Sequence, residues 1–313
     1  MALEKHTLNN DFRVRKYFWE GIDLASLSSD APLTEHWPGL ERPFLFSEKA
    51  FDGVAVGEFP EGVRKYIADM RHFVESVNAE IPLPVQFDDN ELPNSVPSGL
   101  VFKKARAING KGILLKLKVG RHWHAREEFD RCSWDAKRSE IVWRGQPTGH
   151  KDKGSPFAWS RNVRFLLVSK YHSLYNVGFS SLGRKGDLEC EPYVREPLTI
   201  EEQLKHKYVI SLQGNDVATN LKWILASNSV PIMPPPTVET WLLESQLEPY
   251  VHYVPMSDDM KNLPATLEWC RQNDDACRDI AENGQNYIRM FFDTVNEAKI
   301  YTMIYDRYRD LIA

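Results

Sequence analysis

The stretch KYVISLQGNDVATNLKWILASNSVPIMPPP, residues 207–236, decides the fold class. It opens as an apolar strand pattern and then passes through a polar turn that contains Gly214, Asn215 and Asp216. A helix pattern follows at 221–229, and a second apolar run ends at three prolines. This order of strand, turn, helix and strand predicts a parallel βαβ unit, in which the helix covers one face of a sheet.

The same alternation extends along the chain in both directions. Upstream, EIVWRG (140–145) predicts a strand that stops at a glycine, and SRNVRFLLVSKY (160–171) predicts a helix capped by its first serine. Downstream, VETWLLESQL (238–247) predicts a helix, YVHYVPM (250–256) predicts a strand, and the rest is helical in pattern. Together these elements predict an α/β protein with a parallel sheet and C-terminal helices.

The first half of the chain holds similar elements separated by longer turns. PEGVRKYIADMRHFVESVNAEI (60–81) predicts an amphipathic helix, and IPLPVQF (81–87) and KGILLKLK (111–118) predict strands. A segment rich in glycine, proline and charge separates the two halves. We predict one α/β domain over 1–170 and a second over 171–313, with the last helix able to pack back on the first domain.

Composition excludes several functional classes. With 313 residues, a formal net charge of −5 and no run of like charges, the chain lacks the basic footprint of a nucleic-acid-binding protein. It has neither the apolar core of a secretory signal nor an apolar run long enough for a membrane helix, which predicts a cytoplasmic protein. The cysteines show no CxxC spacing, so reduced thiols are expected: Cys132, Cys190, Cys270 and Cys277.

One N-terminal segment raises the question of peripheral contact with the inner face of a membrane. FRVRKYFW (12–19) interleaves cations with aromatic residues, a composition that suits a membrane surface. An ordinary amphipathic segment packed on the core is the simpler interpretation.

The turn of the opening stretch is the first candidate site. In open α/β sheets, ligands bind outside the carboxyl ends of the strands, where the start of a helix favours a phosphate. A glycine there lets the backbone approach a ligand closely, although the turn matches neither GxGxxG nor a Walker loop. The alternative is that these polar residues only cap the helix. The candidates are Gly214, Asn215, Asp216, Val217, Ala218, Thr219, Asn220 and Lys222, with Glu239 further along.

A second candidate site follows the strand at 140–145. Arg144 at its carboxyl end can hold a diphosphate through two parallel hydrogen bonds and stays charged at any pH. Pairing with a surface carboxylate is the alternative for such an arginine. Gly145, Thr148 and Arg161 belong to the same donor side.

Two further groups complete the candidate chemistry. Asp88 and Asp89 follow a strand, where a carboxylate can act as general base for a hydroxyl nucleophile; a solvated turn is the alternative. Arg121 and His122 are assigned to the acceptor or phosphate side. His122 and His124 have a spacing that suits a metal pair, but no third ligand is evident and we expect no metal site.

These motifs, taken in order, resemble glycosyltransferase family 90. That family includes LpsA-like bacterial lipopolysaccharide enzymes, Rumi-type protein O-glucosyltransferases and fungal capsule-associated xylosyltransferases. WDAKRSEIVWRGQPTG (134–149) is similar to its Trp, Lys and aromatic-Arg-Gly strand, and 207–233 to its strand, glycine loop and helix. LEPYVHYVPMSDDMKNL (247–263) and NDDACRDIAENGQNYIRMFF (273–292) resemble its later segments. The resemblance covers about 81–308.

The resemblance implies a GT-B fold, in which two Rossmann-like domains face each other across a cleft: an N-terminal acceptor-binding domain (1–170) and a C-terminal UDP-sugar-binding domain (171–313). It implies inverting transfer of a hexose or pentose from a UDP-sugar to a glycan or lipid-linked glycan acceptor such as lipopolysaccharide, with no metal or other cofactor. Asp88 or Asp89 would then be the base, while Arg144 and 214–219 would hold the diphosphate. A catalytically silent member that binds glycans or nucleotides is the alternative.

Two features depart from the family pattern. The catalytic aspartate of the Rumi-type branch lies in a His-Asp turn that does not align with this chain without a gap, so Asp88 and Asp89 are assigned by their position after the strand at 81–87. The Rumi-type and fungal branches carry an arginine where this chain has Asn220. Because of that departure at Asn220, a catalytically silent member of the family is kept as the alternative. An active enzyme would need another cation on the phosphate side, and the candidates are Lys222, Arg161 and Arg164.

Overall fold

The computed structural model describes residues 8–22, 24–30, 44–46, 61–87, 96–117, 130–149, 162–183 and 188–313. The chain forms two compact units. Unit 1 comprises Met1–His6, Trp123–Pro236 and Gln246–Arg289, and unit 2 comprises Thr7–His122, Thr237–Ser245 and Met290–Ala313. The predicted boundary between 170 and 171 lies inside unit 1, and the predicted division into acceptor and donor domains stays a prediction.

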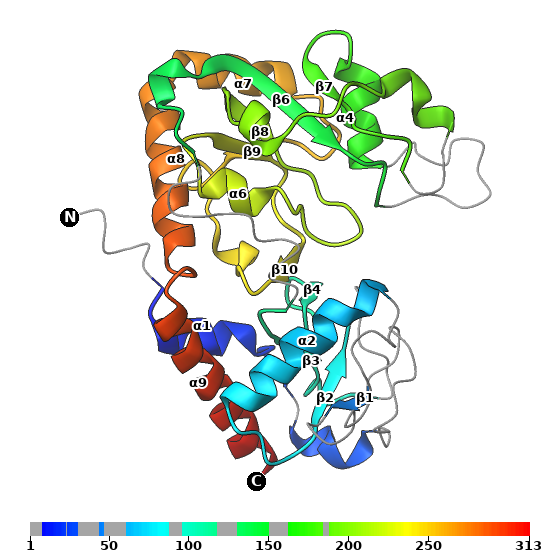
Figure 1. Ribbon diagram of the computed structural model, residues 1–313, viewed down its shortest axis with the longest axis vertical. Helices are drawn as coiled ribbons and strands as arrows, with labels where there is room; N and C mark the ends of the chain where they lie inside the picture. Colours follow the sequence, from blue (N-terminus) through cyan, green and yellow to red (C-terminus); the bar gives the residue numbers. More distant parts are fainter. Residues whose placement is uncertain are drawn as a thin grey trace. The chain divides into compact units, whose positions relative to one another are not determined.

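Unit 1 is built on a five-stranded parallel sheet with the strand order β11-β9-β8-β6-β7 (Figure 1). Its strands are β6 (Arg138–Gly145), β7 (Asn176–Phe179), β8 (His206–Ile210), β9 (Val230–Met233) and β11 (Val254–Pro255). Its α-helices are α4 (Val163–Tyr171), α5 (Ile200–Gln203), α6 (Leu221–Leu225), α7 (Leu263–Gln272) and α8 (Asp274–Arg289), and its short 3-10 helices are Trp134–Ala136 and Leu188–Tyr193. The predicted α/β class with a parallel sheet and C-terminal helices is confirmed.

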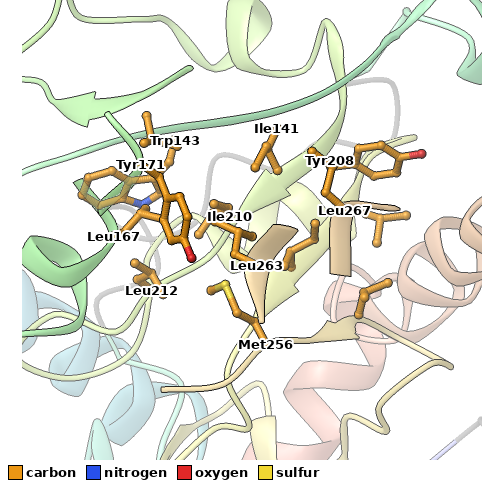
Figure 2. Packing of buried hydrophobic residues seen from close by; sticks show 14 of the residues in the cluster. Ile141, Trp143, Leu167, Tyr171, Tyr208, Ile210, Leu212, Met256, Leu263 and Leu267 are labelled. Carbon is orange, nitrogen blue, oxygen red and sulfur yellow. The ribbon is translucent and has the colours of Figure 1, made fainter. Parts of the chain in front are cut away.

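Both faces of this sheet are buried, as a parallel sheet requires. Alternate side chains of β6 and β8 point to opposite faces, so Ile141 and Tyr208 enter one core while Val142 and Val209 enter the other. The larger core also receives side chains from α4, α7 and α8. Figure 2 shows this packing around Trp143, Leu167, Ile210, Leu212, Tyr171, Met256 and Leu263. On the other face, Trp223 and Ile224 of α6 cover the sheet.

Unit 2 contains a smaller mixed sheet and the last helix. Its strands are β1 (Phe44–Phe46), β2 (Leu83–Gln86), β3 (Phe102–Lys103), β4 (Ala105–Ala107), β5 (Ile113–Leu114) and β10 (Val238–Thr240). The order β1-β2-β3-β5 has β1 antiparallel to β2 and the other pairs parallel, while β10 pairs with β4 separately. Its helices are α1 (Asn10–Tyr17), a 3-10 turn (Leu24–Ser29), α2 (Glu61–Ser76) and α9 (Thr294–Ile312), and α9 packs against α1 and α2.

A buried charge network holds unit 2 together. Arg13 donates to Glu297 at 2.6 Å, and Lys116 donates to the other carboxylate oxygen at 2.9 Å. Tyr17 donates from its hydroxyl to the carbonyl of Trp241 at 3.0 Å. Arg13, Val14, Tyr17 and Phe18 are buried, as the simpler interpretation of 12–19 expects, whereas Arg15 is exposed, and contact with a membrane stays a prediction.

Some elements differ from their prediction. The helix expected at 238–247 is instead β10 followed by a 3-10 turn at Glu244–Gln246. The Glu244 carboxylate accepts from the Thr240 backbone N–H at 2.6 Å and from its hydroxyl at 2.9 Å, and this local bonding competes with a helix. The strands expected at 111–118 and 250–256 are shorter, and the helix at 160–171 begins with Asn162 as its cap. Across the described ranges, none of the helices combines the length and hydropathy needed to cross a bilayer.

Candidate functional site

The candidate site lies where β6 and β8 end. These strands are parallel neighbours, with Val142 beside Val209, so their carboxyl ends meet at the same edge of the sheet. The loop at 146–149 leaves β6, and the loop that begins at 211 leaves β8. This edge is where ligands bind in α/β sheets.

Arg164, in the first turn of α4, joins the two loops. Its Nη1 donates to the Gln146 carbonyl at 3.0 Å and to the Thr148 hydroxyl at 2.7 Å. Its Nε donates to the Gln213 carbonyl and its Nη2 to the Leu212 carbonyl, both at 2.9 Å. Because the Leu212 side chain is buried in the core, this part of the second loop is anchored (Figure 2). We call Arg164 with 146–149 and 212–215 the loop junction.

Two glycines allow the loops of the junction to approach. A Cβ on Gly214 would lie 2.8 Å from the Thr148 hydroxyl and 2.9 Å from Arg164 Nη2. Gly149 has a φ of +105°, and a Cβ there would lie 2.9 Å from the Gly214 carbonyl oxygen. Gly149 requires glycine because of its positive φ and the facing backbone carbonyl, whereas a Cβ on Gly214 would force the ends of the Thr148 and Arg164 side chains to shift.

Two asparagines complete the loop junction. Asn215 accepts from the Gly149 backbone N–H through its Oδ1 at 3.0 Å. Asn162 caps α4 by accepting from the Arg164 and Phe165 N–H groups, and its Nδ2 donates to the Thr148 carbonyl at 3.0 Å. The sequence interpretation missed Asn162, although asparagine directly before a helix pattern is an N-cap signal.

The loop junction carries a positive charge. Among the carboxylates that the structure describes, none forms an ion pair with Arg164, whose hydrogen-bond acceptors are all neutral. Burial lowers the pKa of Arg164 to about 10, and the nearby Asp216 carboxylate opposes that shift. The guanidinium therefore stays protonated at neutral pH, and its field favours an anion at this edge of the sheet.

Asn220 has a structural role in the second loop. Its Nδ2 donates to the Ile210 carbonyl at 2.9 Å, and its Oδ1 accepts from the Ser211 hydroxyl at 3.1 Å. It thereby ties the end of β8 to the start of α6. That helix spans only Leu221–Leu225, shorter than expected, and the anion site expected at its N-terminus stays a prediction.

The remaining residues of this loop differ in exposure. Val217 and Ala218 are buried, Asn215 and Thr219 are exposed, and Lys222 is buried within α6. None of the predicted binding roles of these residues is tested by their positions, so they stay predictions.

Arg144 points away from the loop junction. It follows Trp143 along β6, and successive side chains of a strand lie on opposite faces, while Arg164 lies 6.0 Å from the Trp143 ring. Arg144 donates to the carbonyls of Glu196, Trp143 and Asn176 and to the Asn176 side chain, at 2.8 to 3.1 Å. Burial, with Arg195 nearby, lowers its pKa to about 10. The structure thus does not bring Arg144 together with the loop junction, and its diphosphate role stays a prediction.

Gly145 is explained by packing. A Cβ on Gly145 would lie 2.5 Å from the Trp143 ring, and its carbonyl accepts from the Ser180 N–H at 2.8 Å. The glycine lets β6 end beside β7 with the indole folded against the backbone.

Glu239 lies in unit 2, outside the loop junction. Its Oε1 accepts from Arg106 Nε at 3.0 Å and Nη2 at 2.8 Å, and its Oε2 accepts from the Ser245 hydroxyl at 2.5 Å. The remaining nitrogen of Arg106 donates to the Tyr17 and Gly112 carbonyls. Glu239 therefore holds β10 in its own unit, and its donor-binding role stays a prediction.

The other predicted site residues lie outside the described residues and also stay predictions: Asp88, Asp89, Arg121, His122 and Arg161.

Three residues of the motifs that resemble the family have a structural role at the opposite, amino-terminal edge of the sheet: Trp134, Lys137 and Lys207. Lys137 is fully buried, donates to Asp130 at 2.7 Å and also bonds the Leu204 carbonyl. The Trp134 indole N–H donates to Asp274 at 2.9 Å, and Lys207 donates to the same carboxylate at 2.6 Å. These residues maintain the fold from the edge that lies away from the loop junction.

Known proteins resemble this chain along most of its length. Residues 117–312 match the family model for Glycosyl transferase family 90. O-glucosyltransferase LpsA of Dichelobacter nodosus is 32% identical over 281 residues, which cover 88% of this chain and 81% of that protein. Protein O-glucosyltransferase 1 of Homo sapiens is 24% identical over 168 residues, 50% of this chain and 42% of that protein. The family match spans more than half of the sequence, and this chain therefore belongs to glycosyl transferase family 90.

Proposed function

We propose that this chain is an inverting glycosyltransferase with a GT-B arrangement of two Rossmann-like domains. It moves a hexose or pentose from a UDP-sugar to a hydroxyl group of a surface glycan such as lipopolysaccharide. The observation that carries this proposal is the loop junction, a cation-centred meeting of two loops at the carboxyl edge of a parallel sheet. Membership of the family supports the class of enzyme.

The charge at the loop junction suits the chemistry of a UDP leaving group. When the bond between the sugar and the diphosphate breaks, negative charge grows on the β-phosphate oxygen, and a fixed cation nearby lowers the energy of that state. Arg164 is held by four hydrogen bonds, so it needs no rearrangement during the reaction. In this proposal guanidinium groups stabilise the departing UDP and no metal ion or other cofactor takes part.

The reaction transfers one proton and exchanges one bond at the sugar. A carboxylate, proposed to be Asp89 or Asp88, takes the proton of the acceptor hydroxyl as its oxygen attacks the anomeric carbon. The bond from that carbon to the diphosphate oxygen breaks on the opposite face, so UDP leaves and the configuration inverts. The acceptor is a glycan or a lipid-linked glycan, which would bring the enzyme to the inner face of a membrane.

Transfer is tested with a panel of UDP-sugars, beginning with UDP-glucose because the relative from Dichelobacter nodosus is named an O-glucosyltransferase. Release of UDP is measured with and without a lipopolysaccharide acceptor, and proton NMR of the product gives the anomeric configuration. The matched controls are Asp88→Asn and Asp89→Asn, one of which should bind UDP normally and fail to transfer.

Two outcomes contradict this proposal in different ways. A protein that shows no UDP binding by calorimetry and no UDP release with any donor is not a UDP-sugar enzyme. A protein that binds UDP but transfers no sugar across the panel is the catalytically silent member.

A further inference from the structure

The guanidinium of Arg164 is enclosed by the two loops that it joins. Four hydrogen bonds lead to Gln146, Thr148, Leu212 and Gln213, and Gly214 lies against Nη2 where a Cβ would be 2.9 Å away. The loop junction therefore fixes the orientation of the guanidinium, whose charge lies at the carboxyl edge of the sheet.

The loops depend on Arg164 for their arrangement. Gln146 and Leu212 lie far apart in sequence, and the described contacts between the two loops at this edge are few. Apart from Arg164, the loops are joined by the Gly149 N–H to Asn215 bond at 3.0 Å and by the packing of Gly149 on Gly214. One side chain thus sets the spacing of both loops and supplies the positive charge between them.

Within the described residues no carboxylate forms an ion pair with Arg164, although the Asp216 carboxylate lies near enough to act on its charge. Carbonyl and hydroxyl acceptors orient the guanidinium but leave its net charge, whereas an ion pair would cancel most of the field. The exposed Arg278, by comparison, forms an ion pair with Asp135 at 2.6 Å in the same unit. Both residues are arginines, but they have different partners, so the same substitution can be made at each and Arg278 can serve as the control for Arg164.

We propose that Arg164 is a positioning residue that sets the affinity of this site for phosphate groups, by holding the two loops together and by placing its positive charge between them. This inference rests on the proposed function, because it assumes that the diphosphate of the donor lies at the loop junction. It assigns to Arg164 the discrimination among ligands by phosphate charge, with the uridine part recognised elsewhere.

The experiment compares uridine, UMP and UDP by isothermal titration calorimetry. In the unaltered protein the affinity should rise with each added phosphate. In Arg164→Gln the affinity for uridine should change little, while the affinity gained per phosphate should fall roughly tenfold. Arg278→Gln should keep the whole gain, and thermal unfolding of each variant shows that it is folded.

The outcomes distinguish a failure of this inference from a failure of the proposed function. An equal loss for all three ligands in Arg164→Gln would mean that the residue is only structural and would overturn the inference. Absence of UDP binding by the unaltered protein would instead contradict the proposed function.

A second variant keeps the test valid if Arg164→Gln does not fold. Arg164→Lys retains the charge but cannot make the four bonds, so it should keep more of the phosphate-dependent gain than Arg164→Gln and show a lower kcat. If the two variants bind uridine normally and lose the same share of the gain, the charge of Arg164 does not contribute to phosphate affinity and the inference fails.

Discussion

Gly149 and Gly214 meet backbone to backbone, with room for a hydrogen and no room for a methyl group. A Cβ on Gly149 would lie 2.9 Å from the Gly214 carbonyl oxygen, and a Cβ on Gly214 would lie 2.8 Å from the Thr148 hydroxyl. The close approach of the two loops that Arg164 joins is therefore possible because both residues lack a side chain.

Gly214→Ala should force the loops of the junction apart. Misplacing groups at a binding edge by about 1 Å costs on the order of 100-fold in rate, and we expect a loss of that order in kcat/KM for the donor. Gly284→Ala in α8 is the control, because its Cβ would lie 3.0 Å from Leu225 Cδ2, remote from the loops. It should lower the melting temperature without changing the donor KM. Equal donor KM values in the two variants would contradict the role given to Gly214.

Asn215→Asp separates hydrogen bonding from charge. The carboxylate can still accept from the Gly149 N–H, so the melting temperature should be kept, but its negative charge should oppose a diphosphate. We expect weaker UDP binding by calorimetry, with the loss shrinking at high salt because exposed charges are screened. Asn215→Ala should instead lower the melting temperature. Unchanged UDP affinity in Asn215→Asp would place the diphosphate away from this loop.

Lys137→Ala should destabilise the protein strongly without a direct effect on the loop junction. The variant leaves the Asp130 carboxylate buried without its cation, for a cost of about 3 kcal/mol in the free energy of unfolding. Arg278→Ala breaks an exposed pair with Asp135 and should change that free energy within experimental error. Urea unfolding measures both. A small effect of Lys137→Ala would mean that Asp130 finds water on losing its partner.

Stability should fall as the pH drops below the ordinary range of histidine. Burial lowers the pKa of His206, whose unfolded value is about 6.5, so the unfolded chain binds more protons as the pH falls through that value. The contribution of neutral His206 to stability is fully present above about pH 6.5 and is lost as the pH falls below that value. His206→Gln should flatten this slope in urea unfolding between about pH 7 and pH 5.

His172 limits how far the His206→Gln substitution can flatten the pH dependence of stability. Burial and the neighbouring Arg195 lower its pKa too, so His172 contributes a slope of the same sign. The His206 variant should reduce the acid sensitivity and not abolish it. A slope identical to that of the unaltered protein would show that His206 takes up protons equally in both states.

Removal of divalent metal ions should leave transfer unchanged. The proposed mechanism assigns the charge of the leaving UDP to guanidinium groups, so EDTA should not reduce UDP release and added Mg²⁺ or Mn²⁺ should not increase it. Loss of activity in EDTA that Mn²⁺ restores would contradict this part of the mechanism.

Periodicity was a good guide where one element buries one face. The amphipathic patterns of α2, α8 and α9 and the apolar runs of β6 and β8 were predicted nearly in full, because solvent exclusion acts on each of them locally. It failed at 238–247, where pairing of Val238 to Thr240 with β4 and the Glu244 side chain outweigh the helical pattern.

The loop junction was predictable only in part. Gly214 and Asn215 follow a strand in a turn that signals a site, and the sequence alone identified them as candidates. The sequence could identify Arg164 as one of three candidate cations for the phosphate side, but it could not give the acceptors of Arg164. These are mainly backbone carbonyls, two of them 48 and 49 residues away. Every residue carries a carbonyl, so such bonds leave no trace in the sequence.

The pair formed by Arg13 and Glu297 joins residues 284 positions apart inside one unit. A ribosome delivers every strand of the five-stranded sheet, through Pro255, before it delivers α9. Arg13 therefore waits for its partner until Glu297 is synthesised, so the core of unit 2 can be completed only after the whole five-stranded sheet of unit 1 has been made.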